Sequence, residues 1–181
     1  RGRQGREWWS AAGSGLYASL VIPVPDGERL QELPIRTAAA LAAFASARIH
    51  GDCRIKWPND LVVGRHKLGG ILVDAVSPPS PAGSWAIIGF GLNYQAPVAA
   101  LLPDATSVFE EAVRARVEAP PFTRWVVDGI SAVWEAVTGA EPDWVERFTR
   151  LSAHRSGDTI RFKLDGEEVA GAFGGFDEHG F

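Results

Sequence analysis

Hydrophobic and polar positions along the chain form short apolar runs, which predict strands, and longer stretches of helical spacing. The short runs are bounded by Gly, Pro or Asn-Asp turns, and they place strands at 16–24, 54–57, 61–63, 67–76 and 85–92. Apolar residues recur every three to four positions in three longer stretches, which predicts helices at 32–50, 121–138 and 142–153. Residues 93–106 show neither period and are predicted to be irregular.

The end of the chain differs in pattern from the rest. Residues 159–164 and 167–173 alternate in polarity around an Asp-Gly pair, which predicts a small hairpin. A boundary is expected near Ser156-Gly157. It divides the chain into a main domain and the start of a second one, at 1–156 and 157–181.

Composition narrows the class of protein. The chain has 181 residues, 46% of them hydrophobic, and a net charge of −4, so it can bury a substantial core and is not expected to bind nucleic acid over its whole surface. No apolar run approaches the ~18 residues that a membrane span needs. Cys53 is the only cysteine, which fits a reducing cytoplasm. The absence of methionine and the final Gly180-Phe181 predict a fragment, cut at both ends.

Lysine is rare in this chain, and two of its three lysines frame the densest motif. The motif runs Lys56-Trp57-Pro58-Asn59-Asp60 and resumes at Lys67 with Leu68-Gly69-Gly70. A lysine ammonium is a compact charge that reaches phosphate or carboxylate oxygens. The pattern therefore predicts a site for a small molecule that carries phosphate. The alternatives are a capped turn at Asn59-Asp60 and a bulge at Gly69-Gly70.

Two further glycine motifs suit a bound anion and a flat ligand. The chain opens Arg1-Gly2-Arg3-Gln4-Gly5-Arg6, in which glycines allow close backbone approach and arginines pair with anions. Trp8 follows as a platform for a purine base. The alternatives are a solvated or RNA-binding basic arm and a tryptophan that anchors the core. Gly89 and Gly91 expose one face of their strand, and Asn93 offers an amide that can bind a base.

Metal ligation is not indicated. The four histidines show no ligand spacing, Cys53 has no partner, and each histidine is predicted to lie at the surface or in a turn: His50, His66, His154 and His179.

These motifs, in this order, resemble the biotin–protein ligases, also called biotin–[acetyl-CoA-carboxylase] ligases. The resemblance covers nearly the whole chain and includes a Thr106-Ser107 pair. It implies an α+β fold with a mixed sheet, helices on one side, and a following SH3-like barrel. It also implies that the protein uses Mg²⁺ and ATP to convert biotin into biotinyl-5′-adenylate. The biotin then passes to one lysine of a biotin carboxyl carrier protein.

The resemblance assigns roles by position. Lys67 is the expected catalytic bridge between the biotin carboxylate and the α-phosphate, and Asp60 is expected to orient the carrier lysine. Arg3 is also expected to be catalytic, in a loop that holds the adenylate and slows its escape. Arg1 and Gly2 belong to the same loop, which covers and binds biotin. Arg6, Lys56 and Asn59 are expected to bind the phosphates and their metal ion. Trp8 and Asn93 are expected to bind the adenine. The surface under biotin is expected to be formed by Gly70, Gly89 and Gly91.

Some features of the family are missing from this chain. The segment that precedes the arginine loop, with its Ser-Thr-Asn motif and a glutamine, is absent, and a DNA-binding domain is not supported. Two other functions are kept: a lipoate or octanoate ligase or transferase of the same fold, and a biotin-binding fragment or regulator without catalysis. Exposed strand edges are expected to serve either a homodimer or docking of the carrier.

Overall fold

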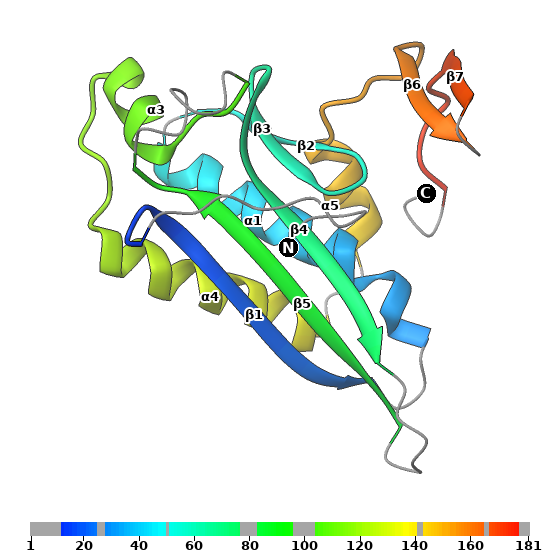
Figure 1. Cartoon of the computed structure of the whole chain (residues 1–181), viewed down its shortest axis with the longest axis horizontal. Helices are drawn as coiled ribbons and strands as arrows, with labels where there is room; N and C mark the ends of the chain where they lie inside the picture. The colour runs from blue at the N-terminus through cyan, green and yellow to red at the C-terminus, as the bar shows by residue number, and fades with distance from the viewer. Residues whose placement is uncertain are drawn as a thin grey trace.

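The computed structural model describes residues 12–24, 28–49, 51–76, 83–95, 104–140, 143–164 and 167–177. In this part of the chain, a five-stranded sheet carries a layer of helices on one face, and a two-stranded hairpin lies near the C-terminal end (Figure 1). This is the α+β class that the sequence predicted.

The main sheet has the order β1-β5-β4-β3-β2, and each neighbouring pair of these strands is antiparallel. Two isolated bridges add parallel pairing, Ile55 with Ser152 and Lys67 with Ala105. The strands are β1 (Gly15–Val24), β2 (Cys53–Lys56), β3 (Asp60–Val63), β4 (His66–Val76) and β5 (Ser84–Asn93).

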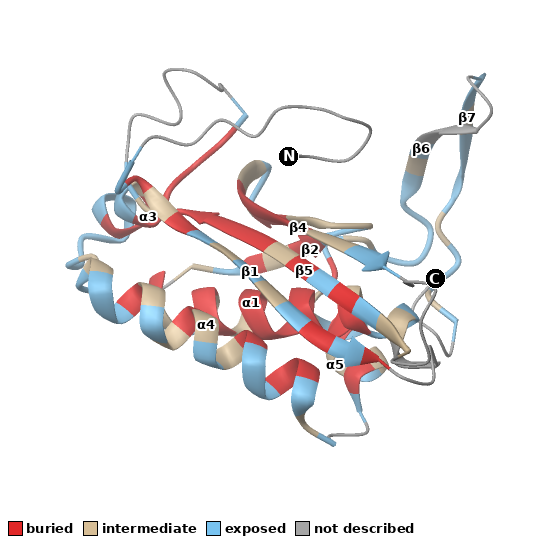
Figure 2. Cartoon of the chain, turned by 60° about the horizontal axis from the view of Figure 1, so that its bottom comes forward, coloured by how far each residue is buried: buried red, intermediate tan, exposed pale blue. Residues whose placement is uncertain are grey.

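Three helices cover one face of the sheet, as Figure 2 shows. A short 3-10 turn (Glu28–Gln31) leads into the central helix, which is alanine-rich and buried along most of its length. Small side chains let this helix lie close to the strands, and the large apolar residues beside it supply most of the burial. The covering helices are α1 (Leu33–Ile49), α4 (Phe122–Thr138) and α5 (Trp144–Leu151).

The alternation along the strands assigns one face of the sheet to the core. Leu16 pairs with Leu92, and Leu92 pairs with Gly69, in a row that faces the helices. Leu16 and Leu92 are fully buried there. Residues of the other parity point to the opposite face, which we call the distal face.

One helix was not predicted. α3 (Val108–Ala115) begins directly after the segment that was expected to be irregular. Its signal was present, because Ser107 is followed three residues later by Glu110, a spacing typical of a helix N-terminus. The Ser107 hydroxyl accepts a hydrogen bond from the Glu110 N–H at 3.2 Å. The other predicted helices and strands are confirmed, with ends that move by a few residues.

The C-terminal hairpin is formed by β6 (Thr159–Leu164) and β7 (Glu167–Ala172), which pair only with each other among the described strands. It agrees with the predicted hairpin, while the domain boundary and the SH3-like barrel stay predictions. In the part of the chain that the structure describes, the helices are too short or too polar to cross a bilayer.

Cys53 is expected to resist thiol reagents in the native protein. Its side chain is fully buried, and burial, assisted by the nearby Asp52 carboxylate, raises the pKa of the thiol to about 12. Because the thiolate is the reactive form, Ellman's reagent at pH 8 should label the folded chain far more slowly than the chain unfolded in urea. Equal labelling rates would contradict the buried position of Cys53 on β2.

Candidate active site

The distal face carries a patch of glycines where β1, β5 and β4 lie side by side. Gly70 on β4 pairs with Gly91 on β5, and Gly89 pairs with Leu72, one step further along the same face. A sheet surface without side chains is flat and lets a ligand lie against the backbone. We call Gly70, Gly89 and Gly91 the glycine bed. The sequence predicted that Gly89 and Gly91 share a face, and the register confirms it.

A β-bulge brings Lys67 to the glycine bed. In a regular strand, residues 67 and 70 would point to opposite faces, because side chains alternate. Here the register of β3 and β4 shifts: Leu61 pairs with Gly69, whereas Val62 pairs with Lys67. Leu68 is the extra residue, and it is fully buried on the core side. The bulge therefore places Lys67 on the distal face with Gly70.

The Lys67 ammonium is paired with Asp60. Its Nζ atom lies 2.6 Å from Asp60 Oδ1, and the Lys67 side chain is 39% exposed. Asp60 pairs with Gly70 in the register, so this contact holds the ammonium beside the glycine bed. A half-exposed ion pair contributes little to stability. The importance of the pair lies in the position of a positive charge that an incoming anion can reach.

The backbone of Lys67 is also fixed on its other side. Its N–H donates to the Asp104 carbonyl at 2.7 Å, and its carbonyl accepts from the Thr106 N–H at 2.9 Å. These bonds tie Lys67 to the segment that leads into α3. The Thr106-Ser107 pair is therefore buried support for Lys67 and the start of α3.

Two asparagines that were predicted to bind the nucleotide are used by the fold. The Asn59 side-chain amide donates to the Ile71 carbonyl at 3.0 Å, and the Ile71 N–H donates back to the Asn59 carbonyl. The Asn93 amide donates to the Thr106 carbonyl at 3.0 Å and to the Lys67 carbonyl at 3.5 Å. Asn93 therefore uses both N–H groups of its amide within the fold, whereas the Asn59 amide keeps a second N–H. The nucleotide roles of both residues stay predictions.

Lys56 and Tyr17 border the bed on opposite sides. Lys56 pairs with Asp60 in the register, is exposed, and lies on the distal face. Tyr17 pairs with Gly91, and its ring lies over Gly15, where an added Cβ would be only 2.6 Å from the phenol. Tyr17 was not among the predicted site residues, although the alternation Gly15-Leu16-Tyr17 places it on the same face as the glycines.

Five predicted site residues lie outside the described residues: Arg1, Gly2, Arg3, Arg6 and Trp8. Their roles stay predictions. Among the residues that are described, the structure contains no group of three or more metal-binding side chains.

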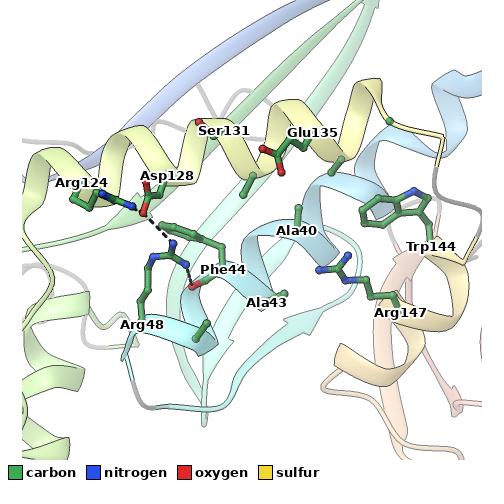
Figure 3. Close-up of a pocket in the computed structure, with 14 residues that line it drawn as sticks. Ala40, Ala43, Phe44, Arg48, Arg124, Asp128, Ser131, Glu135, Trp144 and Arg147 are labelled. Carbon is green, nitrogen blue, oxygen red and sulfur yellow. Dashed lines mark hydrogen bonds and ion pairs between the residues drawn. The ribbon is translucent and has the colours of Figure 1, made fainter.

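A separate hollow lies on the outer side of the helix layer, away from the glycine bed. A groove of about 620 Å³ runs between α1, α4 and α5 (Figure 3). Arg48 and Arg124 both contact the Asp128 carboxylate at its edge, at 3.0 and 2.8 Å. Hydrogen bonds from Arg124 and then Arg48 hold the pKa of Asp128 below its usual range. The groove contains none of the motif residues.

The helix-backed sheet and the Lys67 ammonium beside the glycine bed fit one class of protein, the biotin/lipoate protein ligases. Residues 1–93 match the biotin/lipoate A/B protein ligase family. The chain belongs to this family.

Relatives within the family point to biotin. The chain is 31% identical to the biotin–[acetyl-CoA-carboxylase] ligase of Paracoccus denitrificans over 99% of its own length and 77% of that protein. It is 34% identical to the bifunctional ligase/repressor BirA of Escherichia coli (strain K12), over 51% of this chain and 29% of that longer protein. Its fold matches the biotin protein ligase from Aquifex aeolicus in complex with biotin and ATP, with a TM-score of 0.81 at 21% identity, over 99% and 75% of the two chains.

Proposed function

We propose that this chain is a biotin–protein ligase that activates biotin with ATP and then transfers it to a lysine of a biotin carboxyl carrier protein. The observation that carries the proposal is the Lys67 ammonium, held 2.6 Å from Asp60 at the border of the glycine bed. The glycine bed accepts the flat, largely apolar body of biotin, and its carboxylate then points towards Lys67. The relatives named above support biotin as the substrate.

The first step joins two anions, and this is the physical problem that Lys67 solves. A carboxylate oxygen of biotin attacks the α-phosphorus of ATP, a new P–O bond forms, and the bond to pyrophosphate breaks. The approach is opposed by repulsion between the carboxylate and the phosphate. An ammonium between them offsets that repulsion most strongly in the transition state, where the charges are closest.

The nucleotide is proposed to lie beside the bed, towards Lys56. Lys56 is exposed on the row that contains Asp60 and Gly70, so its ammonium can reach phosphate oxygens. We assign Arg6 to the phosphates, Trp8 to the adenine, and Arg1, Gly2 and Arg3 to the loop over the adenylate, all on the sequence motif alone. Mg²⁺ commonly binds through substrate phosphates with few protein ligands, which fits a described region without a cluster of carboxylates.

In the second step the carrier lysine attacks the acyl carbon of the adenylate, and AMP leaves. Asp60 faces the same space as Lys67 and is proposed to orient the incoming amine. The carrier domain of acetyl-CoA carboxylase or a related carboxylase is the proposed partner, and the reducing cytoplasm is the proposed compartment. A homodimer is a further proposal, since β1 is an edge strand of the sheet.

The test is mass spectrometric detection of biotinyl-adenylate after the purified chain is mixed with biotin and Mg-ATP, with a carrier domain added in a second reaction. Adenylate followed by a biotinylated carrier supports the ligase. A parallel reaction with lipoate in competition tests the related activity, and preferential use of lipoate would replace biotin as the substrate. Biotin binding without release of pyrophosphate would favour a non-catalytic protein.

Filling the glycine bed should abolish tight biotin binding. Gly89→Leu places a branched side chain on the distal face between Leu72 and Ser19, where an added Cβ meets only ordinary contacts at 3.4 and 3.9 Å. We expect the Kd for biotin, measured by calorimetry, to rise about a hundredfold, which corresponds to a loss of roughly 3 kcal/mol. Ile87→Leu, two residues along the same strand, is the matched control. Unchanged affinity in Gly89→Leu would place biotin elsewhere.

A further inference from the structure

His154 lies in the connection between α5 and β6, and the backbone of this connection is fixed against β2. Ser152 forms a parallel bridge with Ile55, and the Ala153 N–H donates to the Ile55 carbonyl at 2.8 Å. The His154 N–H donates to the Ser152 hydroxyl at 3.0 Å. The position of the imidazole is therefore set by the main sheet.

The imidazole contacts the densest motif of the chain through its backbone. His154 Nε2 accepts a hydrogen bond from the Trp57 N–H at 3.2 Å. Trp57 is the first residue after β2, at the start of the turn that connects Lys56 to Asp60. This turn has no pairing partner within the sheet at Trp57, so the histidine provides the acceptor for that N–H.

The turn connects the imidazole to the charge that activates the substrate. Lys56 and Asp60 pair directly across the turn, and Asp60 holds the Lys67 ammonium. A shift of the turn would move Asp60, and Lys67 would follow because the contact between them is short. A continuous path therefore runs from His154 through Trp57 and Asp60 to Lys67.

We propose that His154 is a positioning residue of the activation site, whose unprotonated Nε2 fixes the turn from Lys56 to Asp60 and thereby the direction of the Lys67 ammonium. This inference rests on the proposed ligase function. It assigns a task to a residue that lies almost a hundred positions away from the motif in sequence, and whose ring makes no contact with the glycine bed in any described interaction.

An aromatic cluster supports the imidazole from behind. The His154 ring lies 5.6 Å from the Phe173 ring, which lies 4.9 Å from Phe176, which in turn lies 4.9 Å from Phe148 of α5. Phe173 is also fixed by its N–H, which donates to the Asp158 carbonyl at 2.8 Å. Residues that follow the β6–β7 hairpin therefore hold the histidine against the turn.

The surroundings favour the form of the ring that accepts a hydrogen bond. Burial lowers the pKa of His154, the Asp158 carboxylate opposes this effect, and the Lys56 ammonium adds to it. The neutral ring therefore predominates at neutral pH. Because the donor in this contact is a backbone N–H, Nε2 must carry no proton of its own.

Two variants separate the hydrogen bond from the packing. His154→Phe keeps an aromatic ring against Phe173 but removes the acceptor, whereas His154→Gln keeps an acceptor near the position of Nε2. We expect His154→Phe to lower kcat for biotinyl-adenylate formation about tenfold to a hundredfold. A catalytic group that is misplaced by up to about one ångström has an effect of this size. The KM for biotin should change little, and His154→Gln should retain most of the wild-type kcat.

A readout that does not depend on activity accompanies the kinetics. Hydrogen exchange of the Trp57 amide should become faster in His154→Phe and stay close to wild type in His154→Gln, at equal global stability in urea. Equal kcat in all three proteins, or equal losses in both variants with unchanged Trp57 exchange, would overturn the proposal. A wild-type chain that forms no adenylate would instead refute the ligase function, and the exchange rates alone would then decide whether His154 positions the turn.

Discussion

Lys67→Ala is expected to lower the rate of biotinyl-adenylate formation by about a hundredfold or more, while the chain stays folded. The charge that offsets the repulsion between the carboxylate and the α-phosphate is lost, and removing about 3 kcal/mol of transition-state stabilisation has this effect on the rate. The Lys67 side chain is 39% exposed, so its removal leaves no large cavity. Pyrophosphate release with biotin and Mg-ATP is the measurement.

The small number of lysines makes the control simple. Lys163→Ala removes the same charge from β6 and should leave the rate within about twofold of wild type, because β6 belongs to the C-terminal hairpin and the proposed site lies on the main sheet. Lys56→Ala should raise the KM for ATP more than it lowers kcat. Near-normal turnover by Lys67→Ala would remove Lys67 from catalysis and with it the basis of the proposed mechanism.

The separate effect of Asp60 follows from the same geometry. Asp60→Asn removes the carboxylate that holds the ammonium but keeps the shape of the side chain, so the first step should slow less than in Lys67→Ala. If Asp60 also orients the carrier lysine, transfer to the carrier should fall further than adenylate formation. Single-turnover measurements of the two steps distinguish these effects.

Much of the fold could be predicted from the sequence because local patterns carry it. The spacing of apolar residues and the positions of turn residues predict three of its parts. These are the strand that contains Leu16 and Val24, the alanine-rich helix α1, and the hairpin of β4 and β5. Helix α3 was missed because eight residues contain little more than two turns of periodic pattern. Its cap at Ser107 was the better signal.

The site was only partly predictable, for a physical reason. A sequence motif identifies candidate residues, but the face of the sheet on which each one lies depends on the pairing register of its strand. The bulge at Leu68 decides that Lys67 and Gly70 share the distal face, and it arises from pairing between β3 and β4. The contacts of Asn93 and His154 likewise join segments far apart in sequence. Such contacts have no local signature.

The second large effect is expected from a single methyl group in the sheet. Gly69→Ala should lower the free energy of unfolding by about 3 kcal/mol, since overpacked sites cost this much when their surroundings cannot move. An added Cβ would lie 2.3 Å from the Gly91 carbonyl oxygen and 2.6 Å from a Leu92 methyl. The carbonyl belongs to the backbone of β5, which is paired on both sides, with β1 and with β4.

The matched control is Gly89→Ala, in the strand next to Gly69. There the added Cβ meets the Leu72 carbonyl at 3.4 Å and the Ser19 hydroxyl at 3.9 Å, which are ordinary contacts. The change in its free energy of unfolding should stay within about 1 kcal/mol, because alanine also restricts the unfolded chain. Urea unfolding followed by tryptophan fluorescence measures both variants. Equal urea midpoints for the two variants would contradict the prediction. They would mean that β4 and β5 can move apart at little cost, so that the close approach at Gly69 does not determine the spacing of these strands.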